Sequence, residues 1–358
     1  MLIGLMAASD THENNYFTEI AKTAKSFNMK VCKFSPKNID MDLKKVRGER
    51  FDAESETWIA TSFDLPDFVY DRCFHGLVRE STETRHKIEW LKDNSNFLGM
   101  GLPGKWEVYQ ILKNHPHLQA FFPETVQVTT PEDIIGHLER LDKIIIKPEF
   151  GAGGTGIYLL SKTEDGTLVS MTKKGTKYDR PFSSKSQLNK WLQHLLNRYR
   201  YLCQPYLELC TQNNEPFDLR ILLQKNEKNQ WMERGRGIRT GQKDGITSNL
   251  ATGGEAISLD NFNKRNPETI SIAVEQKIHH ILRTLPVETE AVFERLFELG
   301  IDLGIDKKGQ IWIMDINSKP GRKIIQALQP ETMKDIHRAP FQYSQYLAEQ
   351  LQKEVNRK

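Results

Sequence analysis

The first hundred residues show short apolar runs that alternate with segments of helical periodicity. The runs LIGLMAA, KVCKFS and PDFVYDR are typical of buried strands, whereas YFTEIAKTAKSF and RHKIEWLKDN place their apolar residues at the spacing of an amphipathic helix. Strands that alternate with helices build layered α/β units. The pattern therefore predicts an α/β lobe over residues 1–100.

The rest of the chain has longer elements, divided by polar or glycine-rich stretches. The pattern favours two further lobes at 101–203 and 204–330, followed by a C-terminal helix and tail at 331–358. The elements expected here are a helix at 105–115, strands at 143–147, 157–160 and 220–225, a polar loop at 172–186, a strand-like segment at 246–250, helices at 269–285 and 289–300, and a helix from 333 that breaks or kinks near Pro340.

One strand near the end of the third lobe carries polar side chains that suit a metal ion. In IWIMDIN, Asp315 and Asn317 project from the same face, because side chains alternate along a strand. Residues 306–309 are typical of a tight turn, and a hairpin there would bring Asp302 beside that pair. Oxygen ligands of this kind suit Mg²⁺ in a metal–nucleotide site. Solvated or salt-bridged carboxylates are the alternative.

A lysine and a run of glycines follow a second apolar strand. Lys147 ends the run KIIIK, and Gly151, Gly153, Gly154 and Gly156 come shortly after it. A lysine in a desolvated position needs an anion nearby, and a glycine-rich loop lets backbone N–H groups approach phosphates closely. The segment therefore favours a phosphate site, with a plain strand end and a flexible turn as the alternative.

Two well-known phosphate motifs are matched only in part. Three of these glycines have the spacing of the dinucleotide-binding motif, but the residues after them predict a strand where that motif needs a helix. Residues 99–105 have the spacing of a Walker A loop, yet Trp106 stands where a metal-binding Ser or Thr is needed. Lys105 more plausibly opens a helix, where it is available to a ligand or to water.

Three arginines are interleaved with glycines in RGRGIRTG at 234–241. Guanidinium groups bind carboxylate or phosphate in a bidentate manner, and Arg236 and Arg239 are the two expected nearest a substrate. An exposed basic turn or an RNA-binding segment is the alternative. The run is short and lies between two strand-like segments without repeated aromatic residues, which argues against RNA.

Composition narrows the class of protein. The chain has 358 residues, 38% of them hydrophobic, and a net charge of +3, which favours a globular protein with no nucleic-acid partner. The four cysteines form no C-x-x-C pair, so we expect neither a zinc site nor a disulfide scaffold, and a reducing cytoplasm fits best. The apolar start reads as a first strand, and no segment is long enough to cross a membrane.

Five spaced motifs together carry a resemblance to a known superfamily. The segments KPEFGAGGTGI, CQPYLEL, FDLR, ITSNLATGG and IDLGID with WIMDINSKPG occur in the order found in ATP-grasp domains. YDRCF, LPGKW and SNLATGG further resemble the YheC/YheD family of endospore-coat-associated ATP-grasp proteins. The resemblance implies an α/β pre-grasp lobe at 1–100, and two α+β lobes, a small one at 101–203 and a large catalytic one at 204–330, that clamp ATP.

The resemblance also implies a role for each matching residue. The expected ATP contacts are Lys105 and Lys147 at the phosphates, Gly151, Gly153, Gly154 and Gly156 in a loop over them, Gln204, Tyr206 and Leu207 beside the adenine, and Glu208 at the ribose. The expected ligands of two Mg²⁺ ions, for which Mn²⁺ could substitute, are Asp302, Asp315 and Asn317, and the residues expected near the transferred phosphoryl group are Arg220, Arg239 and Asn249.

Two positions depart from the superfamily pattern. Most ATP-grasp enzymes have Glu where this chain has Asp315, which is one methylene shorter and therefore disfavours bidentate bridging of two ions. Some ligases carry arginine where this chain has Gly300, so a substrate-side arginine must come from elsewhere in the sequence.

The activity implied by the resemblance is that of a carboxylate–amine or carboxylate–thiol ligase. A small-molecule carboxylate would attack Mg-ATP to give an acyl phosphate, which an amine would capture. The family also implies an association with sporulation and with spore-coat proteins, beside a cytoplasmic location. A nucleotide-binding or structural coat protein without catalysis, and a small-molecule kinase, are the two alternatives.

Overall fold

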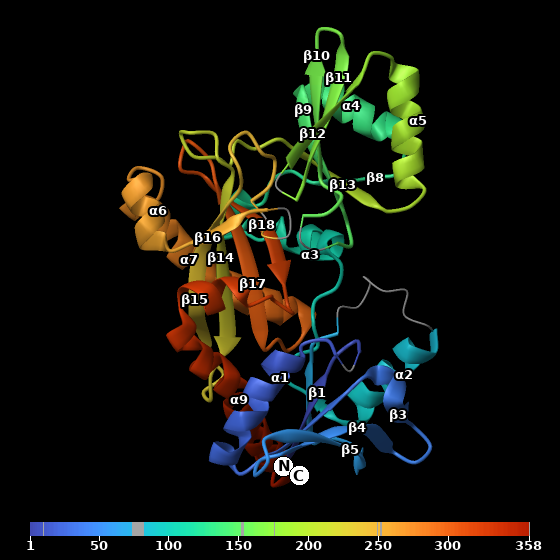
Figure 1. The fold of residues 1–358 in the computed structure, drawn as a ribbon, viewed down its shortest axis with the longest axis vertical. Helices are drawn as coiled ribbons and strands as arrows, with labels where there is room; N and C mark the ends of the chain where they lie inside the picture. The colour runs from blue at the N-terminus through green and yellow to red at the C-terminus, as the bar shows by residue number, and fades with distance from the viewer. Residues whose placement is uncertain are drawn as a thin grey trace.

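The computed structural model describes residues 1–9, 11–73, 82–151, 154–174, 176–248, 250 and 253–357. Three β-sheets with their helices form three lobes (Figure 1), so the predicted α/β class is confirmed. The small lobe lies at one end of the molecule, the first lobe at the other, and the large lobe between them.

The first lobe has a seven-stranded sheet whose central strands are parallel. Its strands are β1 (Leu2–Met6), β2 (Lys30–Phe34), β3 (Ile39–Asp40), β4 (Lys45–Asp52), β5 (Thr57–Asp64), β6 (Phe68–Asp71) and β7 (Asn96–Phe97), and its helices are α1 (Asn14–Thr23) and α2 (Thr82–Asn94). Strand β1 pairs in parallel with β2 and with β6, as the alternating pattern predicts. The β4–β5 hairpin was not predicted, because its mostly exposed residues give no apolar alternation.

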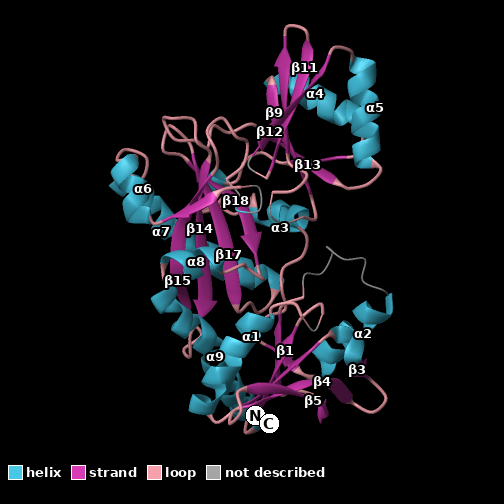
Figure 2. Ribbon diagram, viewed as in Figure 1, coloured by secondary structure: helices cyan, strands magenta, loops and turns pink. Residues whose placement is uncertain are grey.

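The small lobe is a six-stranded antiparallel sheet covered by two helices (Figure 2). Its elements are β8 (Val126–Val128), α4 (Pro131–Leu141), β9 (Lys143–Pro148), β10 (Tyr158–Thr163), β11 (Gly166–Lys173), β12 (Thr176–Phe182), α5 (Lys185–Leu196) and β13 (Tyr201–Pro205). The loop predicted at 172–186 is wrong, since these residues lie mainly in β12 and at the start of α5. Strand β12 lies at a sheet edge with six of its seven residues exposed, so it lacks the apolar alternation that marks a half-buried strand.

The large lobe is a five-stranded antiparallel sheet in the order β16-β15-β14-β17-β18. Its strands are β14 (Phe217–Lys225), β15 (Trp231–Thr240), β16 (Glu255–Ile257), β17 (Glu298–Ile305) and β18 (Ile311–Asn317), and its helices are α3 (Lys105–Leu112), α6 (Leu259–Arg265), α7 (Ile272–Phe293), α8 (Lys323–Leu328) and α9 (Met333–Val355). Short 3₁₀ turns occupy Ala24–Phe27, Pro36–Asn38, Gln119–Phe121 and Pro330–Thr332.

Several predicted elements of the large lobe have different limits. One helix, α7, replaces the two expected at 269–285 and 289–300, and β17 begins at Glu298. The arginine–glycine run lies almost wholly in β15, and the described part of 246–250 contains no strand. Helix α9 continues through Pro340, which is buried, so the predicted break is absent.

Two lobes share a hydrophobic core, whereas the small lobe has its own. One cluster joins Leu5 and Tyr70 of the first lobe to Leu222 of the large lobe and to Phe341 of α9. The small-lobe cluster is built from its own sheet and from helices α4 and α5. The first and large lobes therefore form one packed unit, to which the small lobe is attached. None of the described helices has the length and apolar character needed to cross a bilayer.

Candidate functional site

A cavity of about 810 Å³ lies between the small lobe and the large lobe. Among the described residues, nine lysine and arginine side chains line it, against five aspartate and glutamate side chains. An excess of cations in a concave site favours a ligand with several negative charges. The cavity is therefore suited to a polyphosphate.

Most of the predicted site residues line this cavity. Those that do are Lys105, Lys147, Gly151, Gly154, Gln204, Tyr206, Leu207, Glu208, Arg220, Arg239, Asp302, Asp315 and Asn317. Gly156 is not in the cavity wall, and it lies against Pro148. Gly153 and Asn249 lie outside the described residues.

The β17–β18 hairpin brings the predicted metal ligands together. Asp302 and Asp315 are opposite each other on the two strands, and a register shift follows directly after Asp302. The side-chain amide of Asn317 donates to Asp315 Oδ2 over 2.8 Å, which confirms that the two side chains share a face. The turn at 306–309 closes with the Gly309 N–H donating to the Asp306 carbonyl over 2.9 Å. The hairpin predicted from the sequence is confirmed.

Two arginines from neighbouring strands neutralise Asp302. Arg220 of β14 forms an ion pair with it, and Arg239 of β15 reaches Asp302 Oδ2 over 2.7 Å and also pairs with Asp218. Burial alone would raise the pKa of Asp302, but the two guanidinium groups hold it below the usual range of an aspartate. The carboxylate therefore stays ionised.

Two lysines from different elements contact strand β18. Lys105, in the first turn of α3, places Nζ 2.8 Å from Asp315 Oδ2. Lys147, near the end of β9 in the small lobe, donates from Nζ to the Met314 carbonyl over 3.3 Å. Burial, reinforced by the charge of Lys105, lowers the pKa of Lys147 to about 8. Both lysines thus line the cavity beside the hairpin.

The donor set of the hairpin fits a hard cation. It offers two carboxylates and one amide, and Mg²⁺ prefers oxygen ligands and takes phosphate oxygens for its remaining positions. The described residues contain no group of three or more His, Cys, Asp or Glu side chains that could hold a metal. The third protein oxygen at the hairpin would therefore come from the amide of Asn317. The arrangement suits a metal shared with a nucleotide better than a site made of protein ligands alone.

Part of the cavity wall is apolar. Ile145, Leu207 and Met314 are among the lining residues, and the Tyr206 N–H donates to the Lys143 carbonyl over 3.2 Å. The Gln204 side chain donates to Thr125 Oγ1 over 2.7 Å, so its amide is fixed inside the small lobe. A flat heterocycle would find an apolar surface and main-chain groups here.

Only one of the two arginines expected near a substrate reaches the cavity. Arg239 lines it, whereas Arg236 pairs with Glu233 and with Glu275 of α7, both over 2.5 Å. Two residues three positions apart on a strand project from opposite faces, so both could not reach the site. Arg236 is therefore not brought to the cavity with Arg239, because alternation along β15 places it on the opposite face, where it pairs with glutamates.

The structure gives a steric reason for glycine at position 300, which the sequence did not show. A Cβ atom there would lie 2.5 Å from Cβ of Pro320 and 2.9 Å from a terminal nitrogen of Arg220. The glycine therefore leaves room for the Arg220 guanidinium, which lies over β17 beside its cross-strand partner Asp302.

Asp218 and Ser248 are site residues that sequence reasoning missed. Ser248 donates to Asp218, which in turn holds Arg239. The spacing in FDLR offered a signal, because Asp218 and Arg220 are two apart on a strand and share a face. An ion-pair network around Arg72 was also missed, since its members are up to 309 positions apart in the chain.

A nucleotide-sized cavity lies between the two sheets. Its wall includes lysines and the β17–β18 hairpin that carries the predicted metal ligands (the metal hairpin). This arrangement is that of an ATP-grasp protein. The solved structure of D-cycloserine synthetase DcsG has this fold, with a TM-score of 0.55, 11% identity and coverage of 98% of this chain and 100% of that one. D-alanyl-alanine synthetase A from Vibrio cholerae O1 biovar eltor gives a TM-score of 0.53 at 12% identity, covering 97% and 98% of the two chains.

Sequence comparison narrows the class to one family. The chain belongs to the YheC/D-like ATP-grasp family, whose model matches residues 94–347. Endospore coat-associated protein YheC of Bacillus subtilis (strain 168) is 35% identical over 356 residues, which are 99% of this chain and 98% of that protein. Endospore coat-associated protein YheD of the same strain is 28% identical over 299 residues, covering 82% of this chain and 65% of that protein.

Proposed function

We propose that this protein is an ATP-dependent ligase that joins a carboxylate to an amine through an acyl phosphate. The observation that carries the proposal is the convergence of Lys105, Lys147, Arg220 and Arg239 on a hairpin of oxygen ligands inside one cavity. Phosphoryl transfer needs such positioning and charge neutralisation, and little covalent help from the protein. The names of the two solved synthetases support ligation, although likeness at this level shows only the fold.

ATP would bind with its adenine against Leu207 and the main chain of 204–208, and with Glu208 at the ribose. Lys105 and Lys147 would contact the phosphates, and the glycine segment from Gly151 would cover them and exclude water. Asp302, Asp315 and Asn317 would hold Mg²⁺, in our expectation two ions, and the metal would supply further positive charge to the phosphate oxygens.

In the first step a carboxylate oxygen of the acid substrate attacks the γ-phosphorus of ATP. A new P–O bond forms, the bond to the β-phosphate oxygen breaks, and ADP leaves. The amine nitrogen then attacks the acyl carbon and loses a proton, the bond to the phosphate oxygen breaks, and an amide and phosphate are released. Arg220 and Arg239 would stabilise the charge that develops on the transferred group.

The proposal includes a setting in sporulation. YheC and YheD are named as endospore coat-associated proteins, which supports an association of this chain with spore-coat proteins in addition to its small-molecule substrates. We therefore expect substrates that are present in the cytoplasm of sporulating cells.

Mass spectrometry of metabolites tests the reaction. An extract of sporulating cells is incubated with Mg-ATP and the protein, its Asp315→Ala variant, or an Asp260→Ala control at an exposed position of α6. We expect a product at the summed mass of two metabolites less water, with the intact protein and the control but not with Asp315→Ala. A product heavier by one phosphoryl group would indicate a kinase instead. Neither product, together with no ADP, would favour a binding or structural role.

A further inference from the structure

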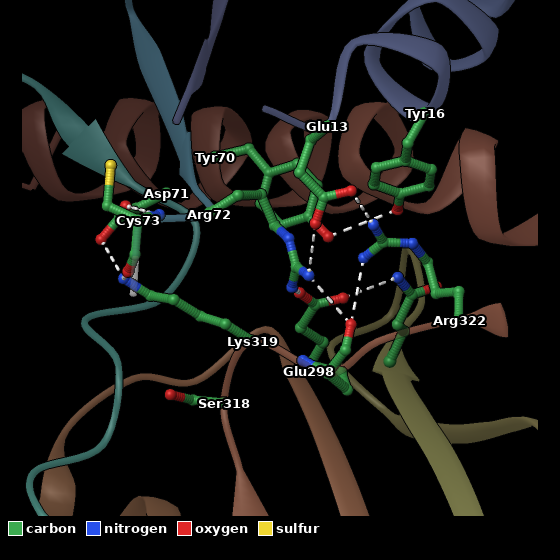
Figure 3. A network of polar contacts seen from close by, with 12 residues as sticks. Glu13, Tyr16, Tyr70, Asp71, Arg72, Cys73, Glu298, Ser318, Lys319 and Arg322 are labelled. Atoms are coloured by element: carbon green, nitrogen blue, oxygen red, sulfur yellow. Dashed lines mark hydrogen bonds and ion pairs between the residues drawn. The ribbon is translucent and has the colours of Figure 1, made fainter. Parts of the chain in front are cut away.

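A network of three cations and three carboxylates joins the first lobe to the large lobe (Figure 3). Arg72 follows β6 and has no exposed surface. It donates to Glu298, to Glu13 Oε1 over 2.9 Å and to the Pro320 carbonyl over 2.9 Å. One guanidinium group of the first lobe therefore holds a loop of its own lobe and two points of the large lobe.

Two more cations complete the network. Arg322 donates to Glu13 Oε2 over 2.5 Å and lies 3.4 Å above the ring of Tyr16. Lys319 donates to Asp71 Oδ2 over 2.5 Å and also to the Cys73 carbonyl. Burial would raise the pKa of Glu13, but Arg72 and Arg322 lower it to about 2. Every charge in the network is therefore compensated.

The points that Arg72 holds are the two ends of the metal hairpin. Glu298 begins β17, four residues before Asp302, and Pro320 lies three residues after Asn317 at the exit of β18. Glu298 also accepts from the Gln224 side chain of β14 over 3.1 Å, so its carboxylate is held from both sides. Arg72 does not line the cavity, whereas Lys319 of the same network does.

We propose that Arg72 is a positioning residue of the Mg-ATP site, acting from the first lobe through the hairpin. This inference rests on the proposed function. By fixing Glu298 and the Pro320 carbonyl together, Arg72 sets the relative position of Asp302, Asp315 and Asn317. A planar guanidinium spreads its N–H donors over three nitrogens in a rigid fork and so spans acceptors on separate elements, whereas the donors of an ammonium all lie on one nitrogen of a flexible stem. Groups that hydrogen-bond a metal ligand directly change metal affinity or activity by about 10- to 100-fold when they are removed, and we expect Arg72, which acts through the two ends of the hairpin, at the lower end of that range.

Stability alone does not explain a pair of this kind. A buried ion pair contributes little net stability relative to uncharged residues of similar size, whereas removal of one partner leaves an uncompensated charge. Removal of both charges in Arg72→Met/Glu298→Gln therefore keeps the interior neutral. It should leave the fold intact while releasing one end of the hairpin from the other.

Titration calorimetry with Mg-ATP and with metal-free ATP distinguishes a role of Arg72 in positioning the metal ligands from a role in stability alone. We expect Arg72→Met/Glu298→Gln to raise the Kd for Mg-ATP by about tenfold or more, and to change binding of metal-free ATP much less. The control is Lys225→Met/Glu290→Gln, which removes a 2.5 Å ion pair between buried Lys225 of β14 and partly exposed Glu290 of α7, neither of which lines the cavity. The control should lower Tm to a similar extent without changing the Kd for Mg-ATP.

A second variant covers the case in which the double variant does not fold. Arg72→Lys keeps the charge but cannot hold Glu298, Glu13 and the Pro320 carbonyl together, so we expect a smaller rise in the same Kd. Equal Mg-ATP affinity in the wild type and in a folded variant would overturn the positioning role alone. If neither variant folds, Arg72 is structural and the inference fails. No Mg-ATP binding by the wild type would overturn the proposed function as well.

Discussion

Both carboxylates of the predicted metal-ligand set have a cation beside them. Asp302 pairs with two arginines and Asp315 with Lys105, so neither leaves an unbalanced buried charge. The same cations would meet phosphate oxygens on the other side. A ligand that carries a metal and several phosphates could therefore be accepted without a large change in the local charge balance.

Lys147 gives the site a pH dependence. Its pKa of about 8 is below the ordinary value of a lysine, because burial and Lys105 disfavour the charged form. Below pH 8 the ammonium is present and can bind phosphate. Above pH 8 the free protein loses this charge, so we expect the Kd for Mg-ATP to rise by up to about tenfold per pH unit.

Titration calorimetry between pH 7 and 9.5 measures this effect, and a variant at position 147 isolates the contribution of the lysine. Lys147→Arg stays charged throughout the range and should remove the dependence on pH. A wild-type Kd that stays constant between pH 7 and 9.5 would contradict the assignment of Lys147 to the phosphates.

Gly300 should tolerate no side chain. Its Cβ would overlap Pro320 and displace Arg220 from Asp302, so we expect Gly300→Ala to lower the free energy of unfolding by about 1–3 kcal/mol. Gly136, in helix α4, has no atom within 4 Å of such a Cβ, and Gly136→Ala should raise stability by about 1 kcal/mol. Chemical denaturation of the two variants measures both effects, and equal shifts would refute the steric explanation.

At the scale of elements, strands buried inside a sheet were the ones that the sequence predicted well. The apolar runs of β1, β2, β6 and β9 lie in sheet interiors, and their burial makes the pattern visible. Strands β5 and β12 lie at edges with most residues exposed, so no alternation marks them. Hydrophobic periodicity in a sequence reflects burial, so elements that bury few side chains cannot be predicted from it.

The metal hairpin was predictable for a different reason, and the cross-lobe contacts were not. Alternation placed Asp315 and Asn317 on one face, and a turn signal brought Asp302 to them. Nothing local in the sequence connects Arg72 with Glu298, because that pairing depends on how two lobes pack. The cation partners of the site follow from tertiary structure and not from spacing.

The turn of the metal hairpin depends on a backbone conformation that favours glycine. Gly309 has φ +72°, a region in which a Cβ costs about 1–2 kcal/mol. We expect Gly309→Ala to lose about this much stability, and Gly309→Asn to lose less, since asparagine adopts this conformation more readily. Thermal unfolding compares the two variants. A loss that is the same for both would show that φ does not limit this turn.

At the scale of the whole molecule, the first lobe and the large lobe depend on one shared core for their stability. Their shared core includes Phe297 of the large lobe and Phe341 and Tyr343 of α9, and the Tyr343 ring stacks on Phe297 at 5.5 Å between centroids. The Arg72 network lies beside this core at the same junction. The small lobe has separate packing, which leaves it the part best able to move relative to the hairpin.

Helix α9 should therefore be essential to the fold. Its apolar residues Ile336, Ala339, Phe341, Tyr343 and Leu347 are all buried. A buried side chain of this kind contributes about 1.5–3 kcal/mol, so their joint loss rivals the whole stability of a domain, about 5–15 kcal/mol. We expect a chain that ends at residue 330 to be insoluble or to lack a cooperative unfolding transition.

The control is a chain that ends at residue 350, because residues 351–357 are exposed. It should unfold at nearly the wild-type temperature in a calorimetric scan. If the chain that ends at 330 also unfolds at that temperature, the terminal helix is an appendage and the shared core does not hold the two lobes together. If it fails as expected, the first lobe cannot be separated from the nucleotide site, since the same junction carries the contacts that fix the metal hairpin.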